Sequence, residues 1–225
     1  MGGVKTGGRT RMPSPRELMH EVQVEWTESG IPSTQSIIDA AAAGMVSRKD
    51  EPYDEFVSSL TLERAKEFLT KMIRLGHESV LEHIIFQFWL RMSRVASHQQ
   101  VRHRMASYTQ MSLRKERRLT ANDFLVPPAV KDEDLDEWIA DTEHVIATYE
   151  KWLKKGYDVD VARRKLTQEI GTDMIMTINA RSLRNYFSLR ARHEADFEIH
   201  AVARKIYALI DAEGLAFLFE DIGLE

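Results

Sequence analysis

The chain has 225 residues, with 31 Lys and Arg, 35 Asp and Glu, 8 His and no Cys. Its length suits one large domain, and its 43% hydrophobic and 29% charged residues exclude a disordered or membrane-embedded chain. The lack of Cys excludes disulfides, Cys-ligated zinc, iron–sulfur clusters and a cysteine nucleophile, and the net charge of -4 disfavours general binding of nucleic acid.

The termini and the apolar runs predict a cytoplasmic protein. No apolar run approaches the ~20 residues of a membrane-spanning helix, and the first residues lack the apolar segment of a signal peptide. Residues 1–12 are rich in Gly and slightly basic, which predicts a flexible tail. We expect a single domain over residues 13–225.

The first half of the chain carries patterns of both helix and strand. Residues 22–27 are expected to form a short strand, and apolar residues at helical spacing predict a helix over 62–73 that stops at Gly76. Residues 84–93 alternate between an apolar and a mixed set, which predicts a long strand. A short helix is expected to follow over 93–104.

The second half is mainly helical by the same criteria. Amphipathic helices are predicted over 135–152, 181–190 and 195–210, with a helical turn or two over 162–169. Because the few strands do not alternate regularly with helices, the fold class is α+β. The Gly pairs near the N-terminus lack the strand and helix context of a phosphate-binding loop.

Arg residues concentrate between positions 91 and 118, with almost no acidic residue before Glu116. This local excess of positive charge indicates an anionic ligand bound in one place. A solvated basic surface is the alternative.

The densest group of polar side chains is the string RHRMASYTQMSLR at residues 102–114. Guanidinium groups bind phosphate and carbonyl oxygens in bidentate fashion, and Ser hydroxyls add neutral donors beside them. The alternative is a surface turn whose Arg residues pair with acids elsewhere.

This string resembles the signature of flavin-dependent thymidylate synthases, RHRxxS followed by four residues and SxR. Three other segments are similar to the same family: GHESVLEH at 76–83, ARRKL at 162–166 and NARSLRNYFSLR at 179–190. The four segments keep the order and plausible spacing of the family. The sequence departs from the family pattern at Gln100, Thr109, Gln110, Lys115 and Thr167.

The resemblance implies a mostly antiparallel central sheet and a homotetramer whose active sites lie between subunits. It implies reductive methylation of dUMP to dTMP, with methylenetetrahydrofolate as the carbon donor and FAD reduced by NADPH. Reduced flavin then supplies a hydride, so that no cysteine thiolate is needed. The missing Cys is expected for such an enzyme.

The resemblance also implies roles for individual residues. Arg190 matches the Arg that contacts the uracil and favours its N3-deprotonated form, which activates C5. The positions that match dUMP-binding residues are Gln99, Arg102, Gln110, Ser112, Arg114, Arg163 and Arg190. Those that match flavin-binding residues are His77, Ser79, Arg102, His103, Arg104, Gln110, Asn179, Arg181 and Asn185.

The His residues admit a structural reading as well. His77 and His103 can be structural, and we expect His83 to be so. We expect no metal site, because the His residues lack compact ligand spacing.

Two other functions remain open from the residues. One is a non-catalytic nucleotide- or RNA-binding module that uses the basic stretch 91–118, and the other is a flavin-binding homologue that modifies a different pyrimidine.

Overall fold

The computed structural model of the chain describes residues 21–46 and 52–223, so the tail predicted over 1–12 lies outside the described residues. The helices and strands are β1 (Gln23–Trp26), α2 (Thr34–Val46), α3 (Tyr53–Ser59), α4 (Leu62–Arg74), β2 (Ile85–Ser93), α5 (Arg94–Gln100), β3 (Ala106–Gln110), α6 (Leu135–Lys154), α7 (Val159–Ala162), β4 (Gly171–Asn179), α8 (Ala180–Arg190) and α9 (Phe197–Ala212). Short 3-10 helices include η1 (Glu78–His83), η4 (Arg163–Lys165), η5 (Ala216–Leu218) and η6 (Glu220–Ile222).

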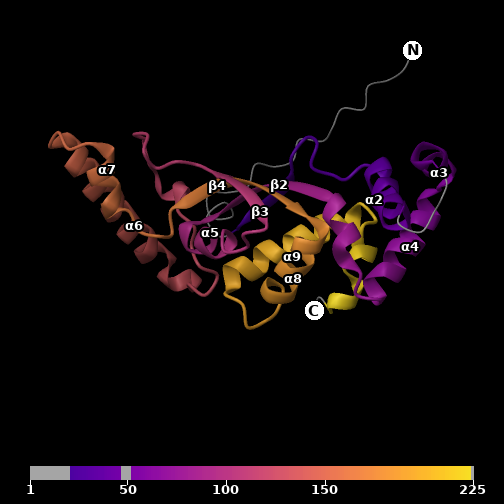
Figure 1. The fold of residues 1–225 in the computed structure, drawn as a ribbon. Coiled ribbons are helices and arrows are strands. Elements are labelled where there is room, and N and C mark those ends of the chain that lie inside the picture. The colour runs from indigo at the N-terminus through magenta and orange to yellow at the C-terminus, as the bar shows by residue number, and fades with distance from the viewer. Residues whose placement is uncertain (1–20, 47–51, 224–225) are drawn as a thin grey trace, which may run out of the picture.

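The sheet lies in the middle of an elongated molecule (Figure 1). The helices α8 and α9 lie beneath it, α6 and α7 project at one end, and α2 to α4 form the other end. The strand order is β1-β2-β4-β3, and all three pairings are antiparallel. This confirms the α+β class and the antiparallel sheet.

The alternation in β2 determines which face of the sheet is buried. Phe86, Phe88, Leu90 and Met92 are fully buried on one face, and they pack in the same core as the apolar residues of α8 and α9. Side chains on the opposite face, such as Trp89, are half-buried. Burial of large side chains on one face stabilises the sheet against these helices by ~1.5–3 kcal/mol each.

Local signals in the sequence set the ends of the elements that lead to the site. Thr61 caps the N-terminus of α4 through a hydrogen bond from Arg64 N, and Gly76, with φ of 72°, follows its C-terminal turn. Ser93 ends β2 and caps α5, because its hydroxyl accepts a hydrogen bond from Ala96 N. The strand therefore passes directly into the helix that precedes the RHR segment.

Two predictions about secondary structure were wrong in detail, and one strand was not predicted. The helix expected over 93–104 ends at Gln100, so Arg102, His103 and Arg104 lie in the turn that follows it. The polar segment after the turn forms β3, because it pairs with β4 at the edge of the sheet. The helical turns expected over 162–169 begin earlier, at Val159, and end at Lys165.

Among the described residues, no helix is both long and apolar enough to cross a membrane.

Candidate active site

The sheet register brings three of the four motif segments to one end of the sheet. Ile85, which follows the HESVLEH segment, pairs with Asn179 at the start of the NARSL helix. Ala106, which follows the RHR turn, pairs with Ile178 on the other side of the same strand. Segments more than 70 residues apart in sequence therefore meet at the junction of β4 and α8.

A cavity of about 600 Å³ lies at this junction. Its volume falls in the range of ~300–1,000 Å³ found for small-molecule sites. Seven of the predicted site residues line it, namely Arg102, His103, Arg104, Asn179, Arg181, Asn185 and Arg190.

Helix α8 presents its residues to the cavity from a fixed start. The Asn179 side chain accepts a hydrogen bond from Ser182 N at 2.8 Å and so caps the helix. One turn of the helix separates Arg181 from Asn185, which places both on the same side. Arg181 also forms an ion pair with Glu82 of η1 at 2.5 Å, which fixes the helix against the HESVLEH segment.

Arg190 is held at the far end of α8 by two residues of the α5 end. Its Nε donates a hydrogen bond to His103 Nε2 at 3.0 Å, and its Nη1 donates to Gln99 Oε1 at 3.4 Å. Burial, together with the positive charge of Arg190, lowers the pKa of His103 to about 4. His103 is therefore neutral near pH 7, and its Nε2 can accept the hydrogen bond from the guanidinium.

A second layer of hydrogen bonds supports His103 from behind. The buried Tyr186 donates to Gln100 Oε1 at 3.0 Å, and its ring contacts the His103 ring edge-on with centroids 4.8 Å apart. Tyr108 donates to the carbonyl oxygens of both Gln100 and His103 at 3.0 Å. Burial raises the pKa of Tyr108 to about 12, and it also raises the pKa of Tyr186, so both phenols remain donors.

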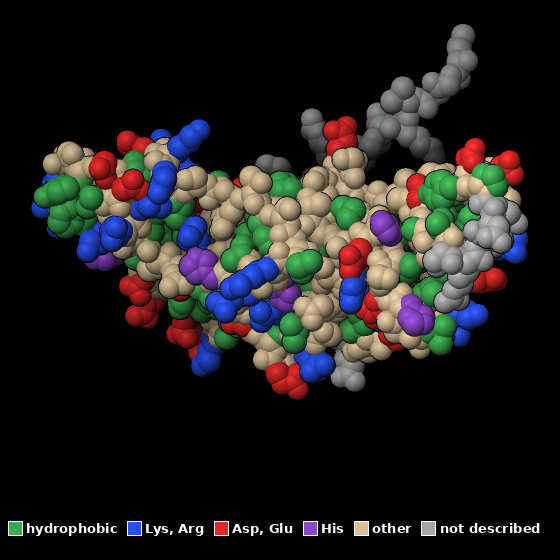
Figure 2. All heavy atoms as spheres, in the orientation of Figure 1, with side chains coloured by type: hydrophobic (Ala, Val, Ile, Leu, Met, Phe, Trp, Pro, Cys, Tyr) green, Lys and Arg blue, Asp and Glu red, His purple; other side chains and the backbone are tan. Residues whose placement is uncertain are grey.

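Arg102 and Arg104 supply uncompensated positive charge to the cavity. Both side chains are exposed, and neither pairs with a carboxylate in the part of the chain that the structure describes. In the space-filling view, Lys and Arg side chains gather near the centre of one face, close to α5 (Figure 2). An anionic ligand is the complement that such unpaired guanidinium groups favour.

His77 and Ser79 line a neighbouring cavity of about 440 Å³ between η1 and α2. Glu82 lines both cavities, so the two sites share a wall. His83 lines this second cavity too, and its structural role stays a prediction.

Gln110 is engaged inside the sheet. Its amide nitrogen donates to Ser97 Oγ at 3.0 Å and to Thr172 Oγ1 at 3.1 Å. The side chain is half-buried and does not line the main cavity. Its predicted contacts with flavin and dUMP therefore stay predictions.

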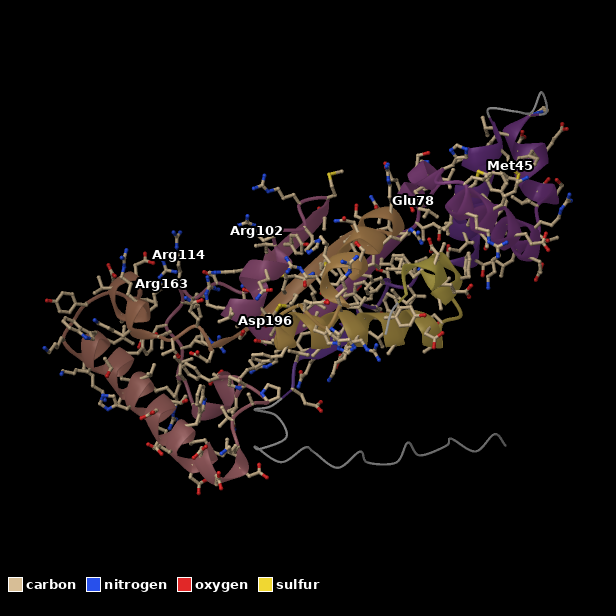
Figure 3. The ribbon with its side chains drawn as sticks, turned by 90° about the horizontal axis from the view of Figure 1, so that it is seen from below. Met45, Glu78, Arg102, Arg114, Arg163 and Asp196 are labelled. Carbon is tan, nitrogen blue, oxygen red and sulfur yellow. The ribbon has the colours of Figure 1, made fainter. Side chains whose placement is uncertain are left out.

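Two of the positions that match dUMP-binding residues, Arg114 and Arg163, lie in a separate group near α7. Arg163 and Arg114 both pair with Asp160 Oδ1, at 2.7 Å and 3.8 Å. Figure 3 shows these two Arg residues beside each other and apart from Arg102. Ser112 lies two residues before Arg114, whose backbone N–H donates to Ser112 Oγ at 3.1 Å. Within one chain, the Arg163 group therefore lies apart from the cavity that Arg190 lines.

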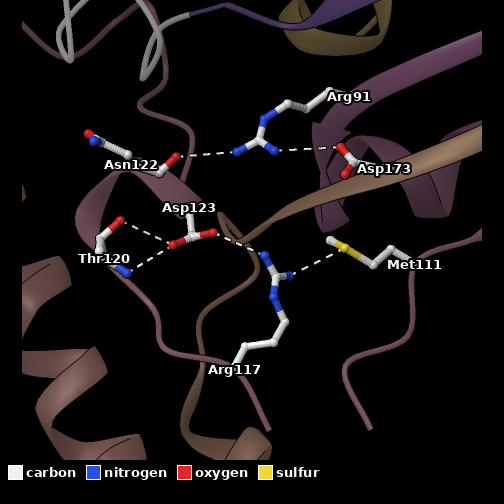
Figure 4. A network of polar contacts seen from close by, with 7 residues as sticks. All are labelled: Arg91, Met111, Arg117, Thr120, Asn122, Asp123 and Asp173. Atoms are coloured by element: carbon white, nitrogen blue, oxygen red, sulfur yellow. Dashed lines mark hydrogen bonds and ion pairs between the residues drawn. The ribbon is translucent and has the colours of Figure 1, made fainter. Parts of the chain in front are cut away.

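A polar network anchors the loop that carries Ser112 and Arg114 (Figure 4). Arg117 donates to Asp123 Oδ1 at 3.1 Å and contacts Met111 Sδ at 3.4 Å. Asp123 also accepts hydrogen bonds from the backbone and side chain of Thr120.

The same network connects this loop with the sheet. Arg91 pairs with Asp173 at 3.5 Å and donates to the carbonyl of Asn122 at 3.3 Å. The mixed face of the sheet thus supports the loop after β3.

Some residues of the cavity were missed by sequence reasoning. Glu78 and Glu82 belong to the HESVLEH segment, and Arg184 follows Arg181 by one turn of α8. Their position in motif segments was a usable signal. Ile222, which also lines the cavity, carried none, because it is 32 residues beyond the last motif.

Among the described residues, no group of three or more His, Asp or Glu side chains is placed to hold a metal ion.

Comparison with known proteins decides the family. A family model described as thymidylate synthase complementing protein (Thy1) matches residues 30–213. The chain belongs to this family. The flavin-dependent thymidylate synthase of Pyrococcus abyssi is 36% identical over 173 residues, which cover 73% of this chain and 70% of that protein. The enzyme of Thermococcus onnurineus is 36% identical over 170 residues, which cover 73% and 69%.

The chain is therefore an enzyme of the flavin-dependent thymidylate synthase family, as the sequence motifs indicated. Its fold is also found in the UMP/dUMP methylase PolB of Streptomyces cacaoi, whose crystal structure holds 5-Br dUMP. The two folds agree with a TM-score of 0.74 at 21% identity, over 91% of this chain and 97% of that one.

Proposed function

We propose that the chain catalyses the reductive methylation of dUMP to dTMP, with methylenetetrahydrofolate as the carbon donor and FAD reduced by NADPH. The observation that carries the proposal is the single cavity in which Arg190 lies together with six other residues of the flavin-binding and substrate motifs. Membership of the family supports the same chemistry.

The donor set of the cavity fits FAD. Arg102, Arg104 and Arg181 supply cationic donors suited to the pyrophosphate, and the amides of Asn179 and Asn185 suit the polar edges of the rings. Ser79 and His77 of the neighbouring cavity would extend the site. When bound, FAD would supply the hydride that completes the methyl group.

Arg190 is the proposed catalytic residue. Its Nε is committed to His103 and its Nη1 to Gln99, so the guanidinium has a fixed orientation before substrate binds. A preoriented cation beside the uracil carbonyl and imide would stabilise the N3-deprotonated form and raise the electron density at C5. Because His103 is neutral, it accepts the hydrogen bond from Arg190 without repelling the guanidinium.

The Arg163 group is the proposed phosphate site for dUMP. The buried Nε of Arg163 has no hydrogen-bond partner within the described ranges. The other guanidinium nitrogens of Arg163, with the exposed side chains of Arg114 and Ser112, would donate to the phosphate oxygens.

The separation of the two groups supports a homotetramer with shared sites. If one subunit supplies Arg190 and another supplies Arg114, then mixed oligomers of Arg190→Ala and Arg114→Ala chains would regain part of the activity that each variant lacks alone. Absence of any recovery, in mixtures shown to exchange subunits, would contradict shared sites. A cytoplasmic location and a single domain over 13–225 remain part of this proposal.

The experiment that tests the proposal has two steps. Purified chain should bind FAD, seen as a shift of the flavin absorbance, and should then convert dUMP to a product with the mass of dTMP. A protein that neither retains nor binds FAD would contradict the proposal.

A different pyrimidine substrate is the second candidate, since PolB, which shares the fold, is described as a methylase of UMP and dUMP. Parallel reactions with dUMP, UMP and dCMP separate the two. An RNA-binding role would instead give FAD-independent binding that weakens steeply with salt.

A further inference from the structure

Arg184 is the only Lys, Arg, Asp or Glu that is buried in the described part of the chain, with 6% of its surface exposed. It lies on α8 between Arg181 and Arg190 and contributes to the wall of the main cavity. A buried cation requires a specific reason, because removal of a charge from water is costly unless the charge is paired.

Its partners come from two other segments. Nη1 and Nη2 of Arg184 donate to the two carboxylate oxygens of Asp221, each at 2.7 Å. Its Nε donates to Glu78 Oε1 at 3.0 Å, and Nη1 also donates to the carbonyl of Leu218 at 2.5 Å. The bidentate pair with Asp221 is the strongest geometry for such an interaction.

The hydrogen bonds to Arg184 lower the pKa of Asp221, so its carboxylate is charged at neutral pH. Burial acts to lower the pKa of Arg184, but its contacts with Asp221 and Glu78 together outweigh burial, so the pKa is raised.

The chain just before Asp221 is held by other means. Leu218 and Phe219 are fully buried, and the Phe219 ring packs edge-on against Phe187 with centroids 5.2 Å apart. By contrast, η6 has no fully buried residue, and within it only Ile222 packs, partly buried, against the core. Asp221 is therefore the main polar attachment of η6, whereas residues up to Phe219 remain anchored without it.

Ile222, which follows Asp221 directly, lines the main cavity. Its place in the wall depends on the position of η6. We propose that the Arg184–Asp221 ion pair positions Ile222 against the cavity, so that the position of η6 affects the affinity for FAD. This inference rests on the proposed function, in which the cavity holds FAD.

The charge effect of a substitution separates positioning from electrostatics. Asp221→Asn removes a negative charge close to the cavity, which alone would favour the anionic FAD. Loss of the bidentate pair would instead release Ile222 and weaken binding. The two effects have opposite signs, so weaker binding indicates positioning.

The test measures the dissociation constant of FAD by flavin fluorescence, with the full chain as apoprotein, at a temperature where circular dichroism shows each variant folded. Asp221→Asn and Ile222→Ala are each expected to weaken FAD binding by ~10-fold, the scale of a shortened apolar contact. The double variant should also bind FAD ~10-fold more weakly than wild type. Independent effects would multiply to ~100-fold, but Asp221 acts through Ile222. The control Glu220→Gln, on a side chain that lines a different cavity, should bind FAD like wild type.

The outcomes separate this inference from the proposed function. FAD affinity of folded Asp221→Asn within twofold of wild type, or a ~100-fold loss in the double variant, would overturn the positioning role. If Asp221→Asn does not fold, unchanged affinity in Ile222→Ala overturns it. A wild-type chain that binds no FAD would overturn the proposed function itself, and the inference with it.

Discussion

Arg190 Nε donates a hydrogen bond to His103 Nε2 at 3.0 Å, and this contact joins two motifs that are 87 residues apart in the sequence. It requires a neutral imidazole, because a protonated His103 would have no acceptor and would repel the guanidinium. Burial and the charge of Arg190 lower the pKa of His103 to about 4, which keeps it neutral near pH 7.

The first prediction concerns stability and pH. The unfolded chain binds a proton at His103 below about pH 6.5, whereas the folded chain binds it only near pH 4. The free energy of unfolding should therefore fall as pH drops from 6.5 to 4, by up to ~3 kcal/mol from this residue. Urea unfolding of wild type and of His103→Gln between pH 6.5 and pH 4 measures this change in the free energy of unfolding. Equal pH dependence in the two proteins would show that His103 titrates normally.

The second prediction concerns catalysis. Arg190→Ala should lower kcat by ~100-fold or more, the scale of losing a preoriented donor to developing negative charge. FAD should remain bound, because the other cavity residues are unchanged. The matched control is Arg192→Ala, two residues further on and exposed. Turnover of Arg190→Ala close to wild type would remove Arg190 from the mechanism.

The third prediction concerns the support behind His103. Tyr186→Phe removes the donor to Gln100 Oε1 in the buried interior. The unfolding free energy should fall by ~1–3 kcal/mol, the usual effect of an unsatisfied buried acceptor. Tyr157→Phe, on an exposed ring, should leave stability unchanged. A Tyr186→Phe protein as stable as wild type would mean that this bond contributes little.

The fourth prediction concerns the loop after β3. Arg117→Gln breaks the contacts with Asp123 and Met111 that anchor the segment carrying Ser112 and Arg114. The KM for dUMP should rise by ~10-fold, which corresponds to ~1.4 kcal/mol of binding, with the dissociation constant of FAD unchanged. The neighbouring exposed Arg118→Gln serves as the control. A change in FAD binding in place of the KM effect would place the loop in the flavin site.

Sequence patterns predicted the elements that have a strong period. The alternation in β2 and the apolar stripes of α4, α6 and α9 gave the correct type of element. The strand β3 was missed because it lies at the sheet edge and carries polar side chains, so its pairing with β4 decides its conformation. The helix α5 stops at Gln100 because the next residues form a turn that Tyr108 holds from β3.

The candidate site was predictable only in part, because contacts between distant segments assemble it. Motif residues such as Arg102, Asn179 and Arg190 could be assigned from sequence, but only the register of β2, β3 and β4 brings them to one cavity. Asp221 and Ile222 had no motif to mark them, and their position depends on one partly buried ion pair. Contacts between distant segments are the information that single-sequence patterns lack.

We propose that this chain couples oxidation of a bound flavin to methylation of dUMP. The most direct measurement is flavin absorbance under anaerobic conditions, with the enzyme-bound FAD reduced beforehand. We expect oxidation of the flavin only when dUMP and methylenetetrahydrofolate are both added, together with a product of the mass of dTMP. Oxidation that is independent of dUMP, or the absence of that product, would contradict it.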